Sequence, residues 1–211
     1  MRQFCGFAAK GMEMIYENTP RIETERLILR KFTDNDLKAY FDIMSDEKAN
    51  QFLPWFCVKT MEEAKKLLHD NCIGLYNMPS AYRYAICLKE HNSPIGYCGF
   101  SGTDSNDIGY GLRTDFWHKG IITEAVTALV ERIKTAGYLY ITATHDINNP
   151  RSGDVMKKIG MSYQYSYVEQ WQPKNISVTF RMYQRNFDGN TTRRYMEYWD
   201  KYPNHFVEEN V

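Results

Sequence analysis

The sequence predicts an α+β domain, in which a mixed, mostly antiparallel central sheet is flanked by helices. Three strand-like segments, 82–89, 94–101 and 107–113, follow one another with turns rich in Asn, Ser, Asp and Pro between them. A helical repeat of apolar residues over 120–137 comes next, and a strand, a short helix and two more strands complete the pattern. Consecutive antiparallel strands joined to helices in this order favour a mixed α+β sheet.

The elements before these strands follow from local signals. Residues 26–31 alternate as a first strand, with Leu27 and Leu29 on one face. The segment from Thr33 has a capping-box pattern and predicts a helix to about residue 44, and a second such pattern predicts a helix over 60–75.

The chain of 211 residues is long enough for one domain with a substantial core. We expect an N-terminal extension over 1–20, a main domain over 21–187 and a C-terminal extension over 188–211. The C-terminal part is rich in Tyr, Trp and Asn, and a helix over 193–201 would dock on the domain or on a second subunit, so a homodimer is possible.

Composition excludes several classes of function. The formal net charge is zero, which gives no electrostatic case for a nucleic-acid partner. Five cysteines without a C-x-x-C spacing indicate reduced thiols in a cytoplasmic protein, with no disulfide framework and no metal site. No apolar run reaches membrane-spanning length, and the first residues lack the apolar core of a secretory signal.

The segment 107–125 reads as a strand, a turn and the start of a helix. Gly109 and Gly111 lie at alternate positions inside the strand. Glycines inside a strand often mark a β-bulge or a place where a ligand comes close to the backbone. Gly120 opens the helix, whose first N–H groups are unpaired and favour an anion. A diphosphate would fit there, and a plain packing unit is an equal alternative. The spacing matches neither a P-loop nor G-x-G-x-x-G.

The run IGYGLRTDFWHKGIITEA resembles motif A of the GNAT superfamily of acyl-CoA-dependent N-acetyltransferases, in the version of the ribosomal-protein N-terminal acetyltransferase-like branch. The resemblance implies the GNAT fold and acetyl-CoA as cofactor. Trp117 takes the usual Gln/Arg position, and Ile122 takes a small-residue position. The implied cofactor-binding residues of this segment are Gly111, Leu112, Trp117, His118, Lys119, Gly120, Ile121, Ile122 and Thr123. Glu124 is assigned to the first turn of the helix, where its charge suits the helix dipole.

The run N-x-x-S-x-x-V-x-x-K-x-G-M from Asn149 to Met161 is similar to motif B of the same superfamily. By itself it reads as a helix start with Ser152 near the cap. The resemblance implies that Asn149 supports the pantetheine arm. Met156 stands where many relatives have a Tyr that acts as the general acid. Ser152 is therefore the candidate for donating a hydrogen bond to the departing thiolate.

For the remaining roles the residues leave alternatives open. Asp107 is the candidate base for the amine proton, with turn capping as its structural alternative and His145 as a competing base. Backbone N–H groups of Gly111 and Leu112 would polarise the thioester carbonyl. Trp55, Phe56 and Tyr110 are candidates for the acceptor site, although an apolar cluster over 50–60 also fits core packing. Tyr163, Tyr165 and Tyr167 are expected on one strand face, half-buried or as an aromatic acceptor wall.

These observations predict an N-acetyltransferase that moves an acetyl group from acetyl-CoA to a primary amine by direct attack. The amine would belong to a protein N-terminus or to a small molecule. The alternative is an acyl-CoA-binding sensor or interaction module without turnover.

Overall fold

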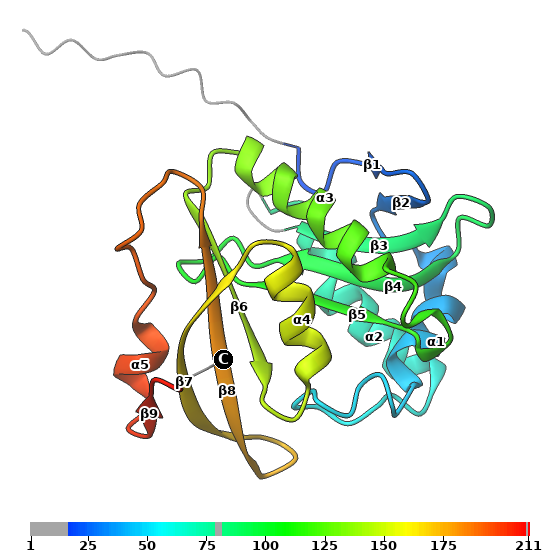
Figure 1. The fold of residues 1–211 in the computed structure, drawn as a ribbon. Helices are drawn as coiled ribbons and strands as arrows, with labels where there is room; N and C mark the ends of the chain where they lie inside the picture. The colour runs from blue at the N-terminus through cyan, green and yellow to red at the C-terminus, as the bar shows by residue number, and fades with distance from the viewer. Residues whose placement is uncertain (1–16, 79–81, 210) are drawn as a thin grey trace, which may run out of the picture.

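The computed structural model describes residues 17–78, 82–209 and 211. Their strands form two sheets (Figure 1). The first sheet is antiparallel, in the order β1 (Ile22–Glu23), β2 (Leu27–Arg30), β3 (Tyr82–Leu88), β4 (Pro94–Phe100) and β5 (Ile108–Leu112). The second has the order β6 (Tyr140–Asp146), β8 (Ile176–Asn186), β7 (Ser162–Trp171) and β9 (His205–Phe206). The predicted α+β class is confirmed, and most of the predicted extension over 1–20 lies outside the described residues.

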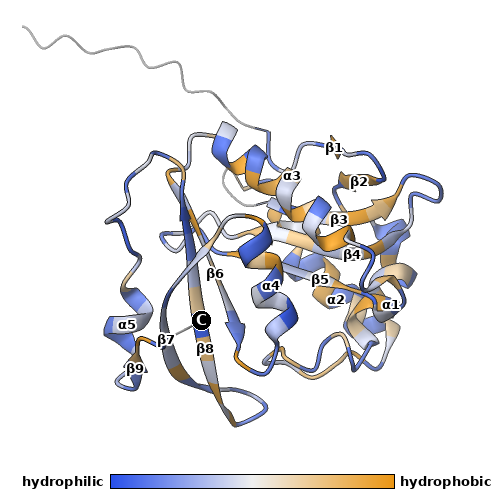
Figure 2. Cartoon of the chain, viewed as in Figure 1, coloured by the Kyte–Doolittle hydropathy of each residue, from blue (hydrophilic) through white to orange (hydrophobic). Residues whose placement is uncertain are grey.

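Helices cover both faces of the first sheet. The alternation of β3 shows this directly, because Tyr84 and Ile86 enter one buried cluster and Ala85 and Cys87 enter another. The first cluster includes α3 (Ile121–Thr135) and α4 (Pro150–Lys158), and the second includes α1 (Leu37–Ser45) and α2 (Met61–Asn71). Figure 2 shows hydrophobic colouring concentrated along β2 and β3, between these layers.

The predicted capping signals are confirmed where the helices begin. Thr33 forms a reciprocal capping box with Asp36 and opens a 3-10 turn, Asp34–Asp36, that leads into α1. The Thr60 side chain accepts the Glu63 N–H at 3.2 Å and starts α2. The second helix is shorter than expected: α2 ends at Asn71, and a separate 3-10 turn follows over Ile73–Leu75.

The two sheets meet at one point and then separate. An isolated parallel bridge joins Asp107 to Thr142, whose N–H donates to the Asn106 carbonyl at 3.1 Å. Beyond this bridge, no ladder joins β5 to β6 in the described chain, and the strands point in different directions (Figure 1). The two strands therefore run parallel only at this bridge and diverge beyond it. We call the region between their unpaired backbone edges the opening, and Asp107 lies at its narrow end.

The C-terminal extension packs on its own domain. The predicted helix over 193–201 is confirmed only as the short α5 (Glu197–Lys201), which covers the aromatic face of β7 and β8. Within that face, Tyr167 stacks on Phe180, Tyr198 and Tyr202 at centroid distances of 5.4, 5.1 and 4.9 Å. After α5, β9 pairs with the outer edge of β7, and Glu208 forms an ion pair with Arg181.

The expectation that Tyr163, Tyr165 and Tyr167 share one strand face is wrong. The register of β7 against β8 shifts between Tyr163 and Tyr165, which is the mark of a β-bulge. Tyr165 and Tyr167 therefore face α5, whereas Tyr163 packs against the cluster on the α3 and α4 side.

Candidate functional site

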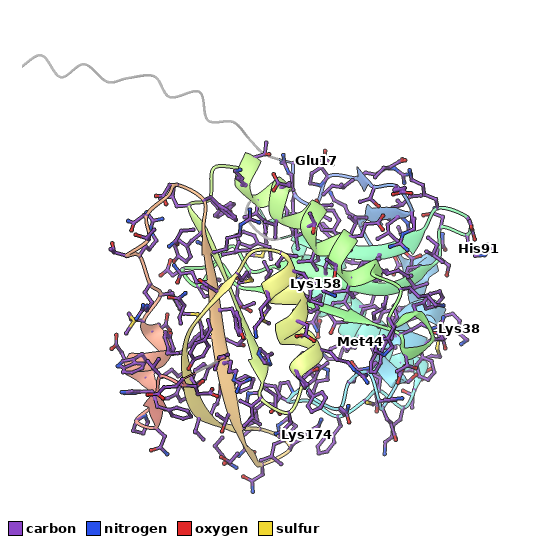
Figure 3. The ribbon with its side chains drawn as sticks, in the orientation of Figure 1. Glu17, Lys38, Met44, His91, Lys158 and Lys174 are labelled. Atoms are coloured by element: carbon purple, nitrogen blue, oxygen red, sulfur yellow. The ribbon has the colours of Figure 1, made fainter. Side chains whose placement is uncertain are left out.

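The start of α3 has the geometry of an anion site. Gly120 takes a left-handed conformation with φ of 73° and precedes the first helical residue, Ile121. The Gly120 carbonyl already accepts the Glu124 N–H at 3.0 Å, while the N–H groups of the first turn point out of the helix end. An open groove of about 570 Å³ adjoins this end, lined in part by Gly120, Thr123 and Lys158 of α4. Lys158 is labelled in Figure 3.

Glu124 also lines this groove, and its carboxylate is bound by Thr24 and Arg26, which lie between β1 and β2 of the first sheet. Its Oε1 accepts the Thr24 hydroxyl at 2.5 Å and the Arg26 N–H at 3.0 Å, and Arg26 Nε donates to Oε2 at 2.7 Å. Burial disfavours the charge, but these bonds outweigh it and lower the pKa of Glu124. Arg26 also donates to the Lys119 carbonyl at 3.0 Å, which fixes the loop before Gly120.

The predicted residues of that loop have distinct surroundings. Trp117 donates its indole N–H to the Leu112 carbonyl at 2.9 Å, and Arg151 lies over its ring at 5.0 Å. Lys119 Nζ bonds the Asp115 carbonyl at 2.9 Å, so in this conformation it is engaged within its own loop. His118 is exposed and left-handed, with φ of 60°. Ile122 is half-buried against the main core.

The hydrogen-bond phase of β5 decides which backbone groups face the opening. Ser101 N–H donates to the Asp107 carbonyl, and Arg113 N–H donates to the Ile95 carbonyl, so odd-numbered residues of β5 pair with β4. The Gly111 N–H therefore points to β4, and it cannot polarise a group in the opening. The expectation that the Gly111 N–H polarises the thioester is therefore wrong, whereas the N–H groups of Leu112, the other predicted residue, and of Tyr110 point away from β4.

The same argument applies across the opening. Ile147 N–H donates to the Thr179 carbonyl, which places the odd-numbered residues of β6 toward β8. The backbone groups of Thr144 and the N–H of Asp146 therefore point to the opening, whereas the Asp146 carbonyl accepts the Asn149 N–H at 2.8 Å. An extended ligand with amides of its own would satisfy both strand edges, and the coenzyme implied by motif A has such an arm and a diphosphate for the end of α3.

Tyr110 and Ser152 form a hydroxyl pair next to the opening. The Tyr110 hydroxyl donates to the Ser152 carbonyl at 2.8 Å and lies 3.0 Å from Ser152 Oγ. Burial raises the pKa of Tyr110, so its hydroxyl stays protonated. Asn149 precedes Pro150 at the start of α4, and its carbonyl accepts the Ser152 N–H at 3.1 Å. Tyr110 thus lies on the α4 side of β5.

A second cavity, of about 340 Å³, lies on the opposite side of the first sheet, against α1 and α2. Trp55 lines it, as does Met44 (Figure 3), whereas Phe56 is 63% exposed and is not among the described lining residues. Lys174, at the turn between β7 and β8, donates to the Gln51 carbonyl at 3.3 Å, so that turn contacts the loop after α1. We refer to this cavity as the α1/α2 pocket.

Asp107 lies at the junction of the pocket and the opening. It lines the α1/α2 pocket, accepts a hydrogen bond from Thr142 Oγ1 at 3.3 Å, and donates its N–H to Ser101 Oγ at 2.9 Å. Burial raises the pKa of Asp107 to about 7, although the Thr142 bond and the charge of Arg83 act in the other direction. A carboxyl group with this pKa can accept and release a proton near neutrality.

His145, the competing base, is enclosed on the other side of the sheet. It is only 4% exposed and packs against Gly153 of α4, where a Cβ would come within 2.6 Å of its Nε2. Its Nδ1 lies 2.9 Å from the Asp146 carbonyl, and burial lowers the pKa of the ring. His145 is therefore neutral and lies away from the α1/α2 pocket.

Two residues near these cavities were not assigned a role from the sequence. Arg83 lines the α1/α2 pocket, and its signal was a charged residue within an otherwise apolar strand. Lys158 lines the groove beside α3 and is the lysine of the second motif.

Among the described residues, no group of His, Cys, Asp and Glu side chains is placed to hold a metal ion. In the described parts of the chain, every helix is too short or too polar to span a bilayer.

Comparison with known proteins gives consistent matches. The family model of the acetyltransferase (GNAT) domain matches residues 26–162. The uncharacterized N-acetyltransferase YnaD of Bacillus subtilis strain 168 is 28% identical over 192 residues, which cover 89% of this chain and 97% of that protein.

Solved structures share the fold. A GNAT-family acetyltransferase from Bacillus anthracis has a TM-score of 0.69 at 24% identity, covering 79% of this chain and 98% of the other. The ribosomal L7/L12 α-N-protein acetyltransferase RimL in complex with coenzyme A has a TM-score of 0.71 at 22% identity, covering 80% and 99%.

Proposed function

The chain belongs to the acetyltransferase (GNAT) family and is an N-acetyltransferase with acetyl-CoA as its acetyl donor, and we propose that its acceptor is a primary amine bound in the α1/α2 pocket. The main support for this proposal is the position of Asp107. Asp107 lines the α1/α2 pocket, and it is also the residue at which β5 and β6 diverge, so the pocket and the opening share it.

The donor would lie along the opening. When bound, acetyl-CoA supplies an acetyl group activated as a thioester. The first-turn N–H groups of α3 after Gly120 would hold its diphosphate, and Lys158 would add positive charge beside the groove. The inward N–H groups of Tyr110 and Leu112 would bind the extended arm and polarise the acetyl carbonyl.

Asp107 would accept the proton that the amine must lose before it can attack. Its pKa of about 7 leaves it ionised at slightly alkaline pH, and its place at the pocket end lets it act directly or through one water molecule. On the α4 side, Ser152 would donate a hydrogen bond to the departing thiolate. Tyr110 fixes the position of Ser152 through its own hydroxyl.

We also propose a cytoplasmic location and a homodimer. The cysteines that the structure describes, Cys57, Cys72, Cys87 and Cys98, are free, and the last three are buried. This supports the proposed cytoplasmic location, where thiols stay reduced. In the proposed homodimer, α5 stays packed on β7 and β8 of its own chain.

Acetyl-CoA titration combined with thiol release tests the proposal. Saturating acetyl-CoA should raise the melting temperature, and desulfo-coenzyme A should do the same because it keeps the diphosphate and the arm. A panel of primary amines should then release free thiol in proportion to acetylated product. A stabilised protein that releases no thiol with any amine would instead match a binding module without turnover, and no stabilisation would remove the proposed donor site.

A further inference from the structure

We propose that the acceptor amine carries an anionic group, a carboxylate or a phosphate, and that Arg83 is the residue that binds it. This inference rests on the proposed function of the α1/α2 pocket, because it assigns a ligand to one wall of that pocket.

Arg83 lies beside two glycines of the first sheet, Gly99 and Gly109, which leave space for a ligand. Arg83 of β3 is opposite Gly99 of β4, and Gly99 is opposite Gly109 of β5. A Cβ at Gly99 would lie 3.3 Å from Arg83 Cδ and Nη1, so the arginine side chain extends over this glycine. A Cβ at Gly109 would meet nothing within 4 Å, so the space above Gly109 is free for a ligand.

Only some of the hydrogen-bond donors of the Arg83 guanidinium group have a partner in the protein. Arg83 Nη1 donates to the Tyr82 carbonyl at 2.9 Å and to the Phe100 carbonyl at 2.7 Å. Its Nε and Nη2 make no hydrogen bond, and no carboxylate lies within 4.0 Å of the group, among the residues that the structure describes. A half-buried cation that forms no direct ion pair is costly, and a carboxylate or phosphate would supply two charge-assisted hydrogen bonds.

The other residues that line the pocket limit the chemical classes of acceptor that it can bind. Much of the wall is aromatic or apolar, with Phe32, Tyr40, Met44 and Trp55. Asp107 is the one carboxylate among the described residues that line the pocket. A polycationic acceptor of the aminoglycoside type would need several acidic groups, and it would meet Arg83 instead. A volume of about 340 Å³ suits a small molecule with an amine at Asp107 and an anion at Arg83.

Matched pairs of small amines test this inference by binding as well as by turnover. The probes are phenylalanine with phenylalaninamide, 4-aminobutyrate with 4-aminobutanamide, and 2-aminoethylphosphonate with propylamine, which vary the anion and its distance from the nitrogen. Affinities are measured by ligand-observed NMR, with and without coenzyme A. The wild-type protein should bind at least one anionic probe about 10- to 100-fold more tightly than its neutral partner, and the carboxylate and phosphonate arms show which anion is preferred.

The variants Arg83→Gln and Gly109→Ala separate recognition from folding. Arg83→Gln should remove the preference for the anionic probe and leave the affinity of the neutral probe unchanged. Gly109→Ala should keep the wild-type melting temperature, since its methyl group meets no neighbour, and should weaken both members of a pair equally. Arg83→Lys keeps the charge without the planar fork and should retain part of the preference.

The outcomes distinguish this inference from the proposed function. Equal affinity for anionic and neutral probes, no binding of any probe, or an equal loss of both in Arg83→Gln would overturn the role of Arg83. Each of these results can occur while acetyl-CoA still stabilises the protein and the family activity stands. If acetyl-CoA fails to bind, the donor proposal falls, and the probe affinities measured without coenzyme A still decide the role of Arg83.

Discussion

Replacing Asp107 with asparagine should stabilise the protein in a pH-dependent way. The carboxyl group has a pKa of about 7 in the folded protein, against 3.8 as its ordinary value. The folded state therefore holds the proton more tightly than the unfolded chain, and the wild-type protein loses stability as the pH rises from about 4 to about 7. Above pH 7 the loss is complete, and below pH 4 it is absent.

The magnitude follows from the size of the shift. A difference of about three pH units, at 1.36 kcal/mol for each unit, corresponds to at most about 4 kcal/mol. Asp107 is partly exposed, and water screening reduces this figure. Urea unfolding at pH 4 and at pH 8 should therefore show Asp107→Asn nearly equal to wild type at the lower pH and more stable at the higher pH.

Asp46 provides a control with the opposite sign. Burial disfavours its charge, but hydrogen bonds from the backbone of Ala49 and Thr114 outweigh burial and lower its pKa. Asp46→Asn should therefore destabilise the protein at pH 8, and this cost should shrink as the pH falls through the lowered pKa. If both variants respond to pH in the same direction, the environment assigned to Asp107 is incorrect.

Catalysis gives a second readout of the same group. With an amine acceptor, kcat/KM should rise through an apparent pKa near 7, apart from any later inflection that belongs to the amine itself. Asp107→Asn should lower kcat by about 10²- to 10⁴-fold and remove the inflection near 7. An unchanged inflection in Asp107→Asn would assign the base to another residue.

Three further predictions follow from the other sites. Gly120→Glu should abolish stabilisation by acetyl-CoA, whereas Gly137→Glu, with the same left-handed strain at the far end of α3, should retain it in a thermal-shift titration. Ser152→Ala should lower kcat by about tenfold with little change in melting temperature, because Tyr110 keeps its bond to the Ser152 carbonyl; unchanged turnover would exclude the hydroxyl from the reaction. Tyr167→Ala should destabilise the protein by about 3 to 5 kcal/mol in urea unfolding, since it empties a buried ring stack, and a cost below about 1 kcal/mol would contradict that packing.

Local signals in the sequence were sufficient for the element order and for several boundaries. The threonines at 33 and 60 cap helices because capping depends on residues within one turn, which a sequence window contains. Gly120 likewise marks the start of α3 through its own backbone conformation. The family motifs added the expected cofactor, which no periodicity of apolar residues could identify.

The errors concern strand phase and long-range packing. Gly111 and Tyr110 alternate in the sequence, but only the pairing of β5 with β4 shows which of their N–H groups faces the opening. The bulge after Tyr163 depends on β8, which lies farther along the chain. His145 reads as an available base until Gly153 of α4 covers it. Arg83 acquires its position only when Gly99 from the next strand lies beneath it.

The free space above Gly109 has a consequence for the divergence of related enzymes. Its neighbours in the sheet are constrained, since a methyl group at Gly96 would strike the Gly111 carbonyl and one at Gly111 would strike the Tyr97 ring. Gly109 has no such constraint and no positive φ, so natural variation there is compatible with the scaffold. A single codon change at this position could reshape the acceptor range while the architecture and the donor-binding elements are inherited intact.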